Sequence, residues 1–431
     1  MTRHAMGWTV VLVVTLAVTA GASDWMGFRG PGARGVSDET GLPLTWSDTE
    51  NLAWKTALPG PGSSSPIVLG DRVFVTCYSG YGLDREKPGD PNRLQRHLLC
   101  LKAVDGGVLW DRAVPAVRPE DAYRGMFREH GYASQTPATD GHRIYVFFGK
   151  TGALAFDLEG NQLWQTRLGD GSDKKRWGSA ASPALSDEMV FINAWDEGKT
   201  LFALDKETGR VMWKKDLTGT GLSFTTPVLA PRGDGGSELI VSVPSQVWGL
   251  DPATGAQLWF ARTGVNDDMI PTPLVLDGVA YIHGGGPRQH GSLAVRTGGA
   301  GDVTDTHILW SSKRVASPPS PVIVDDLMYW VDCYGNACCL EIETAKVRYS
   351  QKVPVTEKFA IYASPVAVEG RLYVVTRKGG TFVLAARPEF EILAHNRLTS
   401  DESDFNGSPA VSRGRLFLRS NRFLYCLSRT P

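Results

Sequence analysis

The chain has 431 residues, of which 42% are hydrophobic, so a large core is available to it. Its 48 glycines and 26 prolines favour many turns over many helices. A formal net charge of −1, with no long run of like charge, argues against nucleic acid or an anionic membrane as a partner.

The N-terminus, MTRHAMGWTVVLVVTLAVTAGASDW, has the parts of a secretory signal peptide. Arg3 lies in a short polar start, Trp8 to Val18 is almost wholly apolar, and Ala20-Gly21-Ala22 fits a cleavage site. We therefore expect residues 1–22 to be removed and residues 23–431 to form a single exported domain. Because no cysteine follows the cleavage site and no later segment is long enough to span a bilayer, we expect a periplasmic or secreted protein without a lipid anchor.

A strand that ends in tryptophan recurs along the chain. LFALDKETGRVMW at 201–213 and VWGLDPATGAQLW at 247–259 show the pattern clearly, and related stretches end at Trp110 and Trp164. Asp-x-x-Thr-Gly in the first two is typical of a turn, because Asp accepts backbone hydrogen bonds and Gly adopts positive φ. Each stretch therefore predicts two strands joined by a polar turn.

A second signature, anchored on a proline, precedes each of these stretches. SSPIVLGDRVFV and ASPALSDEMVFI are two of its versions. Its prolines are Pro66, Pro137, Pro183, Pro227, Pro273, Pro321, Pro365 and Pro409, which give eight repeats. Four short strands in about 45 residues is the period of a propeller blade. We predict an all-β, eight-bladed propeller of four-stranded antiparallel blades.

The two ends of the chain predict how the ring closes. The eighth repeat, which begins at Ser408, stops before its tryptophan strand, whereas NLAWKTAL near the N-terminus is a tryptophan strand without a repeat. A strand from one terminus closes a propeller when it completes the blade begun at the other. We expect the strand of Trp54 to complete the blade that contains Cys426.

Repeats of the form [Ala/Gly]-Leu-Asp-x-x-Thr-Gly-x-x-x-Trp resemble the PQQ-like β-propeller repeats of quinoprotein dehydrogenases and of BamB, the propeller lipoprotein of the outer-membrane barrel assembly machinery. The resemblance covers essentially the whole mature chain, and it is specific for fold and weak for function. In this family the recurring tryptophan docks on a glycine of the neighbouring turn and packs between blades. The resemblance therefore implies a structural inter-blade role for Trp54, Trp110, Trp164, Trp213, Trp259 and Trp310, with Tyr349 as the departure in the sixth repeat.

The adjacent Cys338 and Cys339 raise a redox question, because quinoprotein dehydrogenases carry an adjacent-cysteine disulfide beside their cofactor. Alignment of the third strands places Cys339, like Cys100 and Cys426, in a slot that other repeats fill with Ala or Gly. Free cysteine behaves as a small buried hydrophobic residue, so this slot needs no redox role. Neighbours on a strand point to opposite faces, which argues against a bridge between 338 and 339.

A different pairing is compatible with the predicted hairpin. A two-residue turn at Gly335-Asn336 would place Cys333 opposite Cys338, and this pair is the candidate disulfide in an oxidising compartment. Free thiols and the adjacent bridge remain the alternatives.

The candidate binding site lies in the central funnel, which is reached by the segments just before each first strand. Only the first repeat is expanded, in Tyr81–His97 and Val117–Gly131, and the second of these segments leads toward the funnel. Function on a repeat scaffold concentrates in such deviations and in the loops of one face. The candidate ligand-binding residues are Arg124, Arg128, His130, Arg176, Trp177, Asp267, Asp268, Tyr362, Asp404 and Asn406.

Two functions remain after this inspection. The first is a non-catalytic exported propeller, a monomer that binds an envelope protein, a peptide or a glycan through one face and requires no metal or cofactor. The second is an oxidoreductase that uses pyrroloquinoline quinone with Ca²⁺, which needs an aromatic floor, hard oxygen ligands, an Arg and an Asp base. Compact blades without large insertions favour the first reading, and we assign no catalytic residue.

Overall fold

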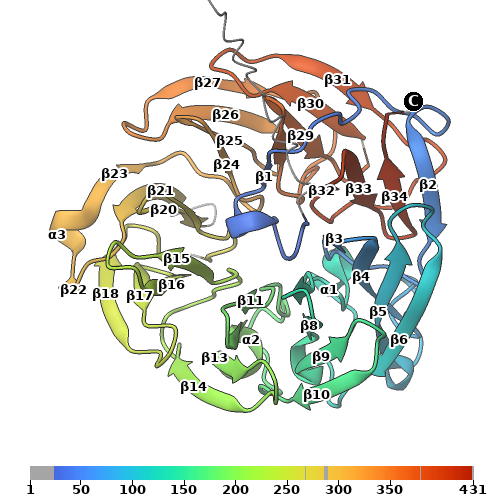
Figure 1. Ribbon diagram of the computed structural model, residues 1–431, viewed down its shortest axis with the longest axis horizontal. Coiled ribbons are helices and arrows are strands. Elements are labelled where there is room, and N and C mark those ends of the chain that lie inside the picture. Colours follow the sequence, from blue (N-terminus) through green and yellow to red (C-terminus); the bar gives the residue numbers. More distant parts are fainter. Residues whose placement is uncertain (1–23, 267, 286–289, 379, 430–431) are drawn as a thin grey trace, which may run out of the picture.

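The structure is a computed structural model that describes residues 24–266, 268–285, 290–378 and 380–429; the predicted signal peptide, 1–22, lies outside them. Eight antiparallel sheets, each with four strands in sequence from the axis outward, surround a central axis (Figure 1). The predicted all-β, eight-bladed propeller is therefore confirmed. No helix within these described ranges is long and apolar enough to cross a membrane.

Each blade follows the predicted order of a short inner strand, two longer strands and an outer strand. Blades one to four contain β3 (Ile67–Leu69), β4 (Arg72–Ser79), β5 (Gln95–Lys102), β6 (Val108–Pro115), β7 (Ala138–Thr139), β8 (Arg143–Phe147), β9 (Ala153–Asp157), β10 (Gln162–Thr166), β11 (Ala184–Leu185), β12 (Met189–Ala194), β13 (Thr200–Asp205), β14 (Val211–Asp216), β15 (Val228–Pro231), β16 (Ser237–Val243), β17 (Gln246–Leu250) and β18 (Gln257–Arg262). Blades five to eight contain β19 (Leu274–Leu276), β20 (Val279–Gly285), β21 (His290–Arg296), β23 (Ile308–Ser312), β24 (Val322–Val324), β25 (Leu327–Val331), β26 (Asn336–Glu341), β27 (Val347–Lys352), β28 (Val366–Val368), β29 (Arg371–Val375), β30 (Thr381–Ala385), β31 (Ile392–Asn396), β32 (Ala410–Ser412), β33 (Arg415–Arg419), β34 (Phe423–Leu427) and β2 (Leu52–Ala57). Two further strands, β1 (Val36–Ser37) and β22 (Gly301–Asp302), add in parallel to β28 and β18.

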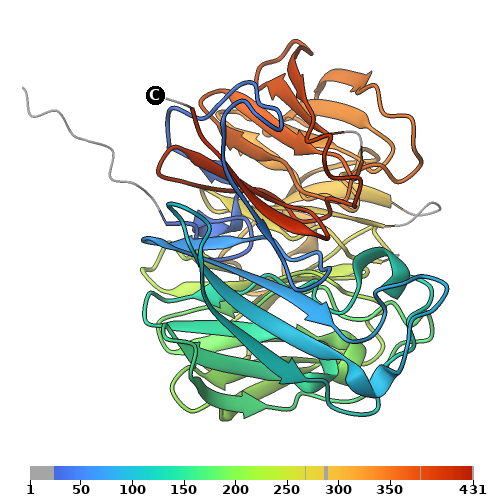
Figure 2. The same ribbon diagram turned by 90° about the vertical axis from the view of Figure 1, so that its right-hand side faces the viewer.

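The helices are single turns in the connections between strands. They are α1 (Phe127–His130), α2 (Trp195–Gly198), α3 (Thr304–His307), η1 (Pro31–Ala33), η2 (Pro91–Arg93) and η3 (Gly149–Thr151). Seen from the side, the strands cross the thickness of the ring, so the connections gather on its two faces (Figure 2).

The ring closes between its two ends, as predicted. Strand β2 pairs antiparallel with β34, and Trp54 lies opposite Cys426. The last blade is therefore built from both ends of the chain, and its outer edge is covered by the N-terminal strand.

The segment before β2 is a strap, residues 24–46, that runs under several blades. Trp25 exchanges two 2.9 Å backbone hydrogen bonds with Val68 of the first blade, and β1 extends the seventh. Between these contacts η1 lies at the centre of the ring in Figure 1. The strap therefore closes one end of the central channel.

The recurring tryptophans tie each blade to the next one. Five indole Nε1 groups donate to a backbone carbonyl of the adjacent blade: Trp54 to Ala103 (3.0 Å), Trp110 to Leu158 (3.0 Å), Trp164 to Lys206 (2.9 Å), Trp213 to Pro252 (2.9 Å) and Trp310 to Ile342 (2.7 Å). A glycine is required beneath the ring, since a Cβ at Gly209 would lie 2.6 Å from Trp164. Trp259 differs, because its Nε1 donates to the buried Glu238 at 2.6 Å, and Glu238 accepts from Gly298 of the next blade at 2.9 Å.

The seventh blade has no tryptophan of its own, because Ala394 occupies the position on β31. Trp46 of the strap is 4% exposed and stacks on Tyr373 of this blade with ring centroids 6.2 Å apart. In five other blades the strand tryptophan contacts the corresponding second-strand aromatic residue, as Trp164 does with Tyr145 at 6.1 Å. The strap therefore supplies the large aromatic ring that the seventh repeat lacks.

The predicted register of the cysteine hairpin is wrong. Trp330, and not Cys333, lies opposite Cys338, because the turn is longer than two residues. Asp332 holds this turn by accepting hydrogen bonds from the N–H groups of Tyr334 (2.8 Å) and Asn336 (2.9 Å). Cys333 is left beyond the paired strands, and the candidate Cys333–Cys338 disulfide is not formed.

All six cysteines of the described chain are buried free thiols. Cys338 and Cys339 belong to the cores on opposite faces of their strand. Cys339 lies opposite Tyr349, and Cys100 lies opposite Trp110, so each fills the small slot beside the large ring of the outer strand.

We expect thiol titration to find six reactive cysteines in denaturant and almost none in the native protein. Burial raises the pKa of Cys77 and of Cys338 to about 12, so neither forms a reactive thiolate near neutral pH. Peptide mapping without reduction provides the second measurement, and a bridged 333–338 or 338–339 fragment would contradict the structure.

Candidate functional site

A belt of hydroxyl groups surrounds the axis of the propeller. It is formed by the Ser or Thr that precedes each repeat proline: Ser65, Thr136, Ser182, Thr226, Thr272, Ser320, Ser364 and Ser408. The backbone N–H of each residue donates to the hydroxyl of the next blade in seven successive hydrogen bonds of 2.9–3.4 Å. The belt is open only at the junction of the last and first blades, where Ser65 Oγ has no hydrogen-bond partner among the described residues.

We expect Ser364→Ala to lower the free energy of unfolding by about 1–2 kcal/mol, because it leaves the buried N–H of Ser320 without an acceptor. Ser65→Ala is the matched control, since the hydroxyl that it removes accepts no belt hydrogen bond. Urea denaturation of both variants measures the difference. Equal losses in the two variants would show that the belt hydrogen bonds contribute nothing.

A cavity of about 210 Å³ lies above the belt, on the axis. Its walls are mainly apolar and aromatic, and its floor is the belt. The wall residues are Phe28 of the strap, Met126, Trp177, Ala180, Phe224, Ile270, Pro318 and Tyr362. Trp177 and Phe224 are stacked, with centroids 5.9 Å and planes 25° apart. This cavity is the funnel, and it is the candidate binding site.

The structure brings four of the ten sequence-derived candidates together in the funnel: His130, Trp177, Tyr362 and Asn406. Asp268 and Asp404 lie at its rim in ion pairs. Arg124, Arg128 and Arg176 are exposed and do not line the cavity, and Asp267 lies outside the described residues. The segment Val117–Gly131 of the first repeat therefore lines the funnel with Met126 and His130, and not with its arginines.

The loops of the first repeat are held together by an aromatic cluster. Tyr78, Tyr81, Tyr123, Phe127 and Tyr132 are buried against one another, and Phe127 stacks on Tyr132 at 4.8 Å. This packing positions α1, and α1 carries His130 into the funnel. The imidazole Nε2 donates to the carbonyl of Trp177 and Nδ1 contacts Ser134 Oγ, both at 2.7 Å. Because burial lowers the pKa of His130, the ring is neutral at pH 7.

Charged groups at the rim are engaged with one another. Lys175 Nζ lies 2.6 Å from Asp268 and 4.4 Å from the centre of the Trp177 ring. Arg377 contacts Asp404 and Glu129, each at 2.9 Å, and lies over the Tyr362 ring at 4.8 Å. Asn406 also accepts from Arg377 Nε at 3.0 Å and donates to the carbonyl of Glu129 at 3.0 Å. Each of these charged groups at the rim therefore lies against a group of opposite charge.

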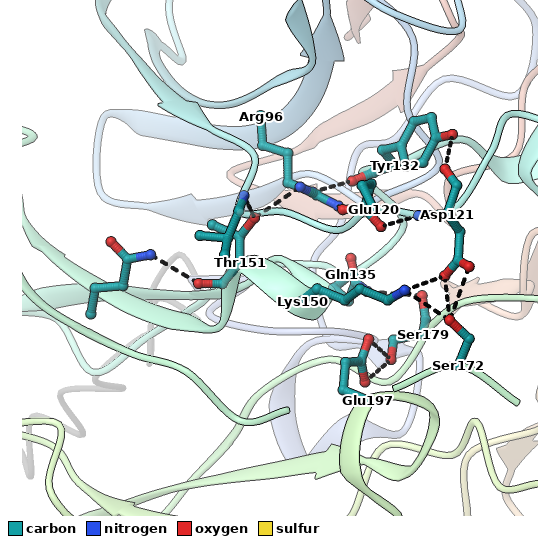
Figure 3. A network of polar contacts seen from close by, with 12 residues as sticks. Arg96, Glu120, Asp121, Tyr132, Gln135, Lys150, Thr151, Ser172, Ser179 and Glu197 are labelled. Carbon is teal, nitrogen blue, oxygen red and sulfur yellow. Dashed lines mark hydrogen bonds and ion pairs between the residues drawn. The ribbon is translucent and has the colours of Figure 1, made fainter. Parts of the chain in front are cut away.

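A network of buried charges lies beside the funnel between the first three blades (Figure 3). The acidic side chains exceed the basic ones: Glu120, Asp121, Asp173, Asp196 and Glu197 against Arg96 and Lys150. Arg96 pairs with Glu120 and Lys150 with Asp121 at 2.8 Å, whereas Glu197 accepts from Ser179 at 2.5–2.6 Å. Burial, followed by the neighbouring carboxyls, raises the pKa of Asp196 to about 8, and burial raises that of Glu197 to about 7. We call these seven side chains the acid network.

Sequence inspection missed the belt, the strap residue Phe28 and the acid network. The belt had a visible signal, the Ser or Thr before every repeat proline. Phe28 had none, because the strap does not follow the repeat. The members of the acid network are far apart in the sequence, and only the packing of three blades brings them together.

The chain is similar in sequence to two kinds of known protein, a dehydrogenase and an outer-membrane assembly factor. The chain is similar to the polyvinylalcohol dehydrogenase of Pseudomonas sp., with 27% identity over 385 residues, which are 85% of this chain and 49% of that protein. It is also similar to the outer membrane protein assembly factor BamB of Alkalilimnicola ehrlichii, with 28% identity over 173 residues, 39% of this chain and 36% of that protein. The chain spans about half or less of the length of these relatives.

Solved structures show the same fold at low sequence identity. BamB from Moraxella catarrhalis superposes with a TM-score of 0.62 at 15% identity, over 88% of this chain and 97% of that one. The quinohemoprotein alcohol dehydrogenase of Comamonas testosteroni superposes with a TM-score of 0.57 at 11% identity, over 95% of this chain and 81% of that one. These two likenesses show the fold that the chain shares with both proteins.

The family model described as outer membrane protein assembly factor BamB matches residues 92–195, 152–303 and 197–430. The chain belongs to this family.

The described funnel residues supply one part of the calcium–quinone site that the dehydrogenase resemblance implies. An aromatic surface is present in Trp177 and Phe224. However, no group of three or more His, Cys, Asp or Glu side chains among the described residues is placed to hold a metal ion. The rim carboxylates that could contribute, Asp268 and Asp404, face Lys175 and Arg377 instead.

Proposed function

We propose that this protein is an exported, non-catalytic scaffold that binds a polypeptide partner of the cell envelope through the funnel face. One observation carries the proposal: the imidazole and the charged side chains of the funnel and its rim are bonded to other groups of the protein. A catalytic centre keeps acid, base or metal-binding groups available to a substrate. Here His130 holds Trp177 and Ser134, and Arg377 holds two carboxylates and Asn406.

The family supports this proposal, because its model describes an assembly factor of the outer membrane. The alternative, an oxidoreductase that uses pyrroloquinoline quinone, is supported by the similarity to polyvinylalcohol dehydrogenase. The two functions make opposite predictions for the purified protein.

We expect a photo-crosslinking residue at Tyr334 or Lys358, which lie in loops on the funnel face, to capture a discrete protein in envelope preparations. The same residue at Leu109 or Met212, exposed on the outer strands, is the matched control and should capture none. Calorimetry with pyrroloquinoline quinone and Ca²⁺ should show no binding. Micromolar quinone binding together with alcohol-dependent dye reduction would refute the proposed function.

A further inference from the structure

We propose that the face opposite the funnel binds a second partner, an extended and positively charged polypeptide segment that adds as a strand to the sixth blade. The site is a groove of about 640 Å³ between the strap and the inner strands of the fifth, sixth and seventh blades. The inference goes beyond the proposed function, because it concerns another face and does not depend on what the funnel binds. Three features carry it: the position of the groove, an uncovered strand edge and a set of free carboxylates.

The groove and the funnel lie at opposite ends of the inner strands. Residues just before the repeat prolines line the funnel, as Tyr362 and Asn406 do. Residues after the prolines line the groove, among them Leu274, Ile323 and Ala367. Each inner strand begins at the funnel and ends at the groove, so a partner in the groove leaves the mouth of the funnel open.

The strap shows that the inner edges of the blades accept an added strand. Trp25 exchanges two backbone hydrogen bonds with Val68 of the first blade. Ala367 of the seventh blade donates to the carbonyl of Gly35 at 2.8 Å. Val68 and Ala367 are each the middle residue of a three-residue inner strand. Because hydrogen-bonded and non-hydrogen-bonded positions alternate in an antiparallel pair, this middle residue directs its N–H and C=O to the open edge.

Ile323 holds the same position in β24 of the sixth blade, and its edge is not covered. It lies opposite Met328, as Val68 lies opposite Val73. It lines the groove, and among the described residues no segment outside the sixth blade forms a backbone hydrogen bond with it. An uncovered edge of this kind is a template for a strand from another chain.

The charge around this edge determines which strand it would attract. One basic residue, Arg34, lines the groove, against six acidic residues: Asp38, Glu39, Asp277, Asp325, Asp326 and Glu369. The four aspartates are exposed, and within the described chain their carboxylates form no ion pair and no hydrogen bond. A cleft lined by charges of one sign attracts a ligand of the opposite sign.

Turn chemistry alone does not explain these free carboxylates. Aspartate is common in the turn between the first two strands of a blade, because it tolerates positive φ. In the first two blades the carboxylates of this turn are paired, Asp71 with Arg413 at 2.7 Å and Asp140 with Lys206 at 3.0 Å. Around the groove the turns of the fifth and sixth blades lack such a partner among the described residues, so their charges remain available to a ligand.

The spacing of the carboxylates favours a polypeptide. No three His, Cys, Asp or Glu side chains of the described residues are placed to hold a metal ion. Positive charges spread along the groove, as on the lysine or arginine side chains of an extended chain, fit this spacing better. Such a chain also presents N–H and C=O groups to Ile323, a pairing that a polyamine cannot make.

The test uses calorimetry of the full chain with a blocked pentapeptide, Lys-Val-Lys-Val-Lys. We expect this peptide to bind, with an affinity that falls as the NaCl concentration rises, and Glu-Val-Glu-Val-Glu not to bind. Asp325→Asn/Asp326→Asn should weaken binding about threefold to tenfold, because it removes two charges and retains the turn. Asp187→Asn/Glu188→Gln is the matched control and should bind like the parent, since these exposed residues lie in the same turn of the third blade, outside the groove. Equal losses in both variants, or no binding of the lysine peptide, would overturn the inference.

Two further measurements test the added strand itself. The lysine peptide N-methylated at its three central residues cannot donate the backbone hydrogen bonds and should bind about tenfold more weakly. Binding of the unmodified peptide should slow amide hydrogen exchange at Ile323, whose N–H would then be bonded. Unchanged exchange at Ile323 would overturn the strand addition, as would equal binding of the N-methylated peptide or of spermine.

This proposal and the proposed function fail separately. Crosslinks from the funnel face should persist in Asp325→Asn/Asp326→Asn, because that face is unchanged. Absence of such crosslinks in the parent protein would refute the function of the funnel and leave the groove as a binding site.

Discussion

Deletion of residues 24–58 should abolish the folded ring. This segment carries Trp25, Trp46 and Trp54, which are 0–8% exposed and share a core with the first, seventh and eighth blades. Burial of an aromatic side chain removes about 150–250 Å² from water at about 25 cal/mol per Å². The three rings together therefore contribute an amount comparable to the whole stability of a domain, about 5–15 kcal/mol. Circular dichroism and urea denaturation of the shortened chain measure the loss.

Single variants separate this effect from poor expression of the deletion. Trp54→Ala and Trp46→Ala should each lower the free energy of unfolding by about 3–5 kcal/mol, because each leaves a large cavity at a seam between blades. Leu109→Ala is the control, since Leu109 is 43% exposed on an outer strand and should change stability by less than about 0.5 kcal/mol. A shortened chain that melts like the parent would contradict the closure of the ring by β2.

The second large effect concerns pH. The raised pKa of about 8 for Asp196 means that the folded protein holds a proton that the unfolded chain, with a pKa near 3.8, has lost above pH 5. The folded state therefore binds more protons between about pH 4 and pH 8, and its stability should fall as the pH rises through this window. Glu197, with a pKa raised to about 7, contributes in the same direction.

Asp196→Asn removes the titrating group and keeps an oxygen that can accept from the N–H of Asp173. We expect this variant to be more stable than the parent at pH 8–9 by about 1–3 kcal/mol and to show a flatter dependence of stability on pH. Asp170→Asn is the matched control, because Asp170 is an exposed carboxylate in a nearby loop. Urea denaturation at intervals from pH 5 to pH 9 provides the measurement. A parent protein that becomes more stable toward pH 9 would show that the acid network is not protonated.

The features that recur in every repeat could be predicted from the sequence. Blade number, strand order and closure by Trp54 all follow from the spacing of prolines and tryptophans, because the blades share one arrangement of strands and packed side chains. Funnel residues could be found where they lie at a fixed offset from the repeat proline, as Tyr362 and Asn406 do, each three residues before it. Arg124 and Arg128 were misplaced because a charged loop residue can face the funnel or the solvent, and only the packing of α1 decides between them.

Features outside the repeat could not be predicted in this way. Trp46 and Phe28 belong to the strap, whose path depends on blades far away in the sequence. The register of the cysteine hairpin depended on one side chain, Asp332, which lengthens the turn and moves Cys333 out of the pairing. The acid network is a property of three packed blades and has no local pattern.

The strap and β2 also determine the order in which the protein can fold. Trp54 pairs with Cys426 and Trp46 packs on Tyr373, so the earliest part of this chain waits for partners that the ribosome adds more than 300 residues later. Contacts of such sequence separation make folding slow, because a very long loop must close before they form. Until those partners are synthesised, the edge of β2 stays unpaired and the indoles of Trp46 and Trp54 stay exposed. Both features make the nascent chain prone to association. During synthesis from the N-terminus, six blades can therefore form from residues close in sequence. The seventh and eighth blades also need Trp46 and β2, which are synthesised first.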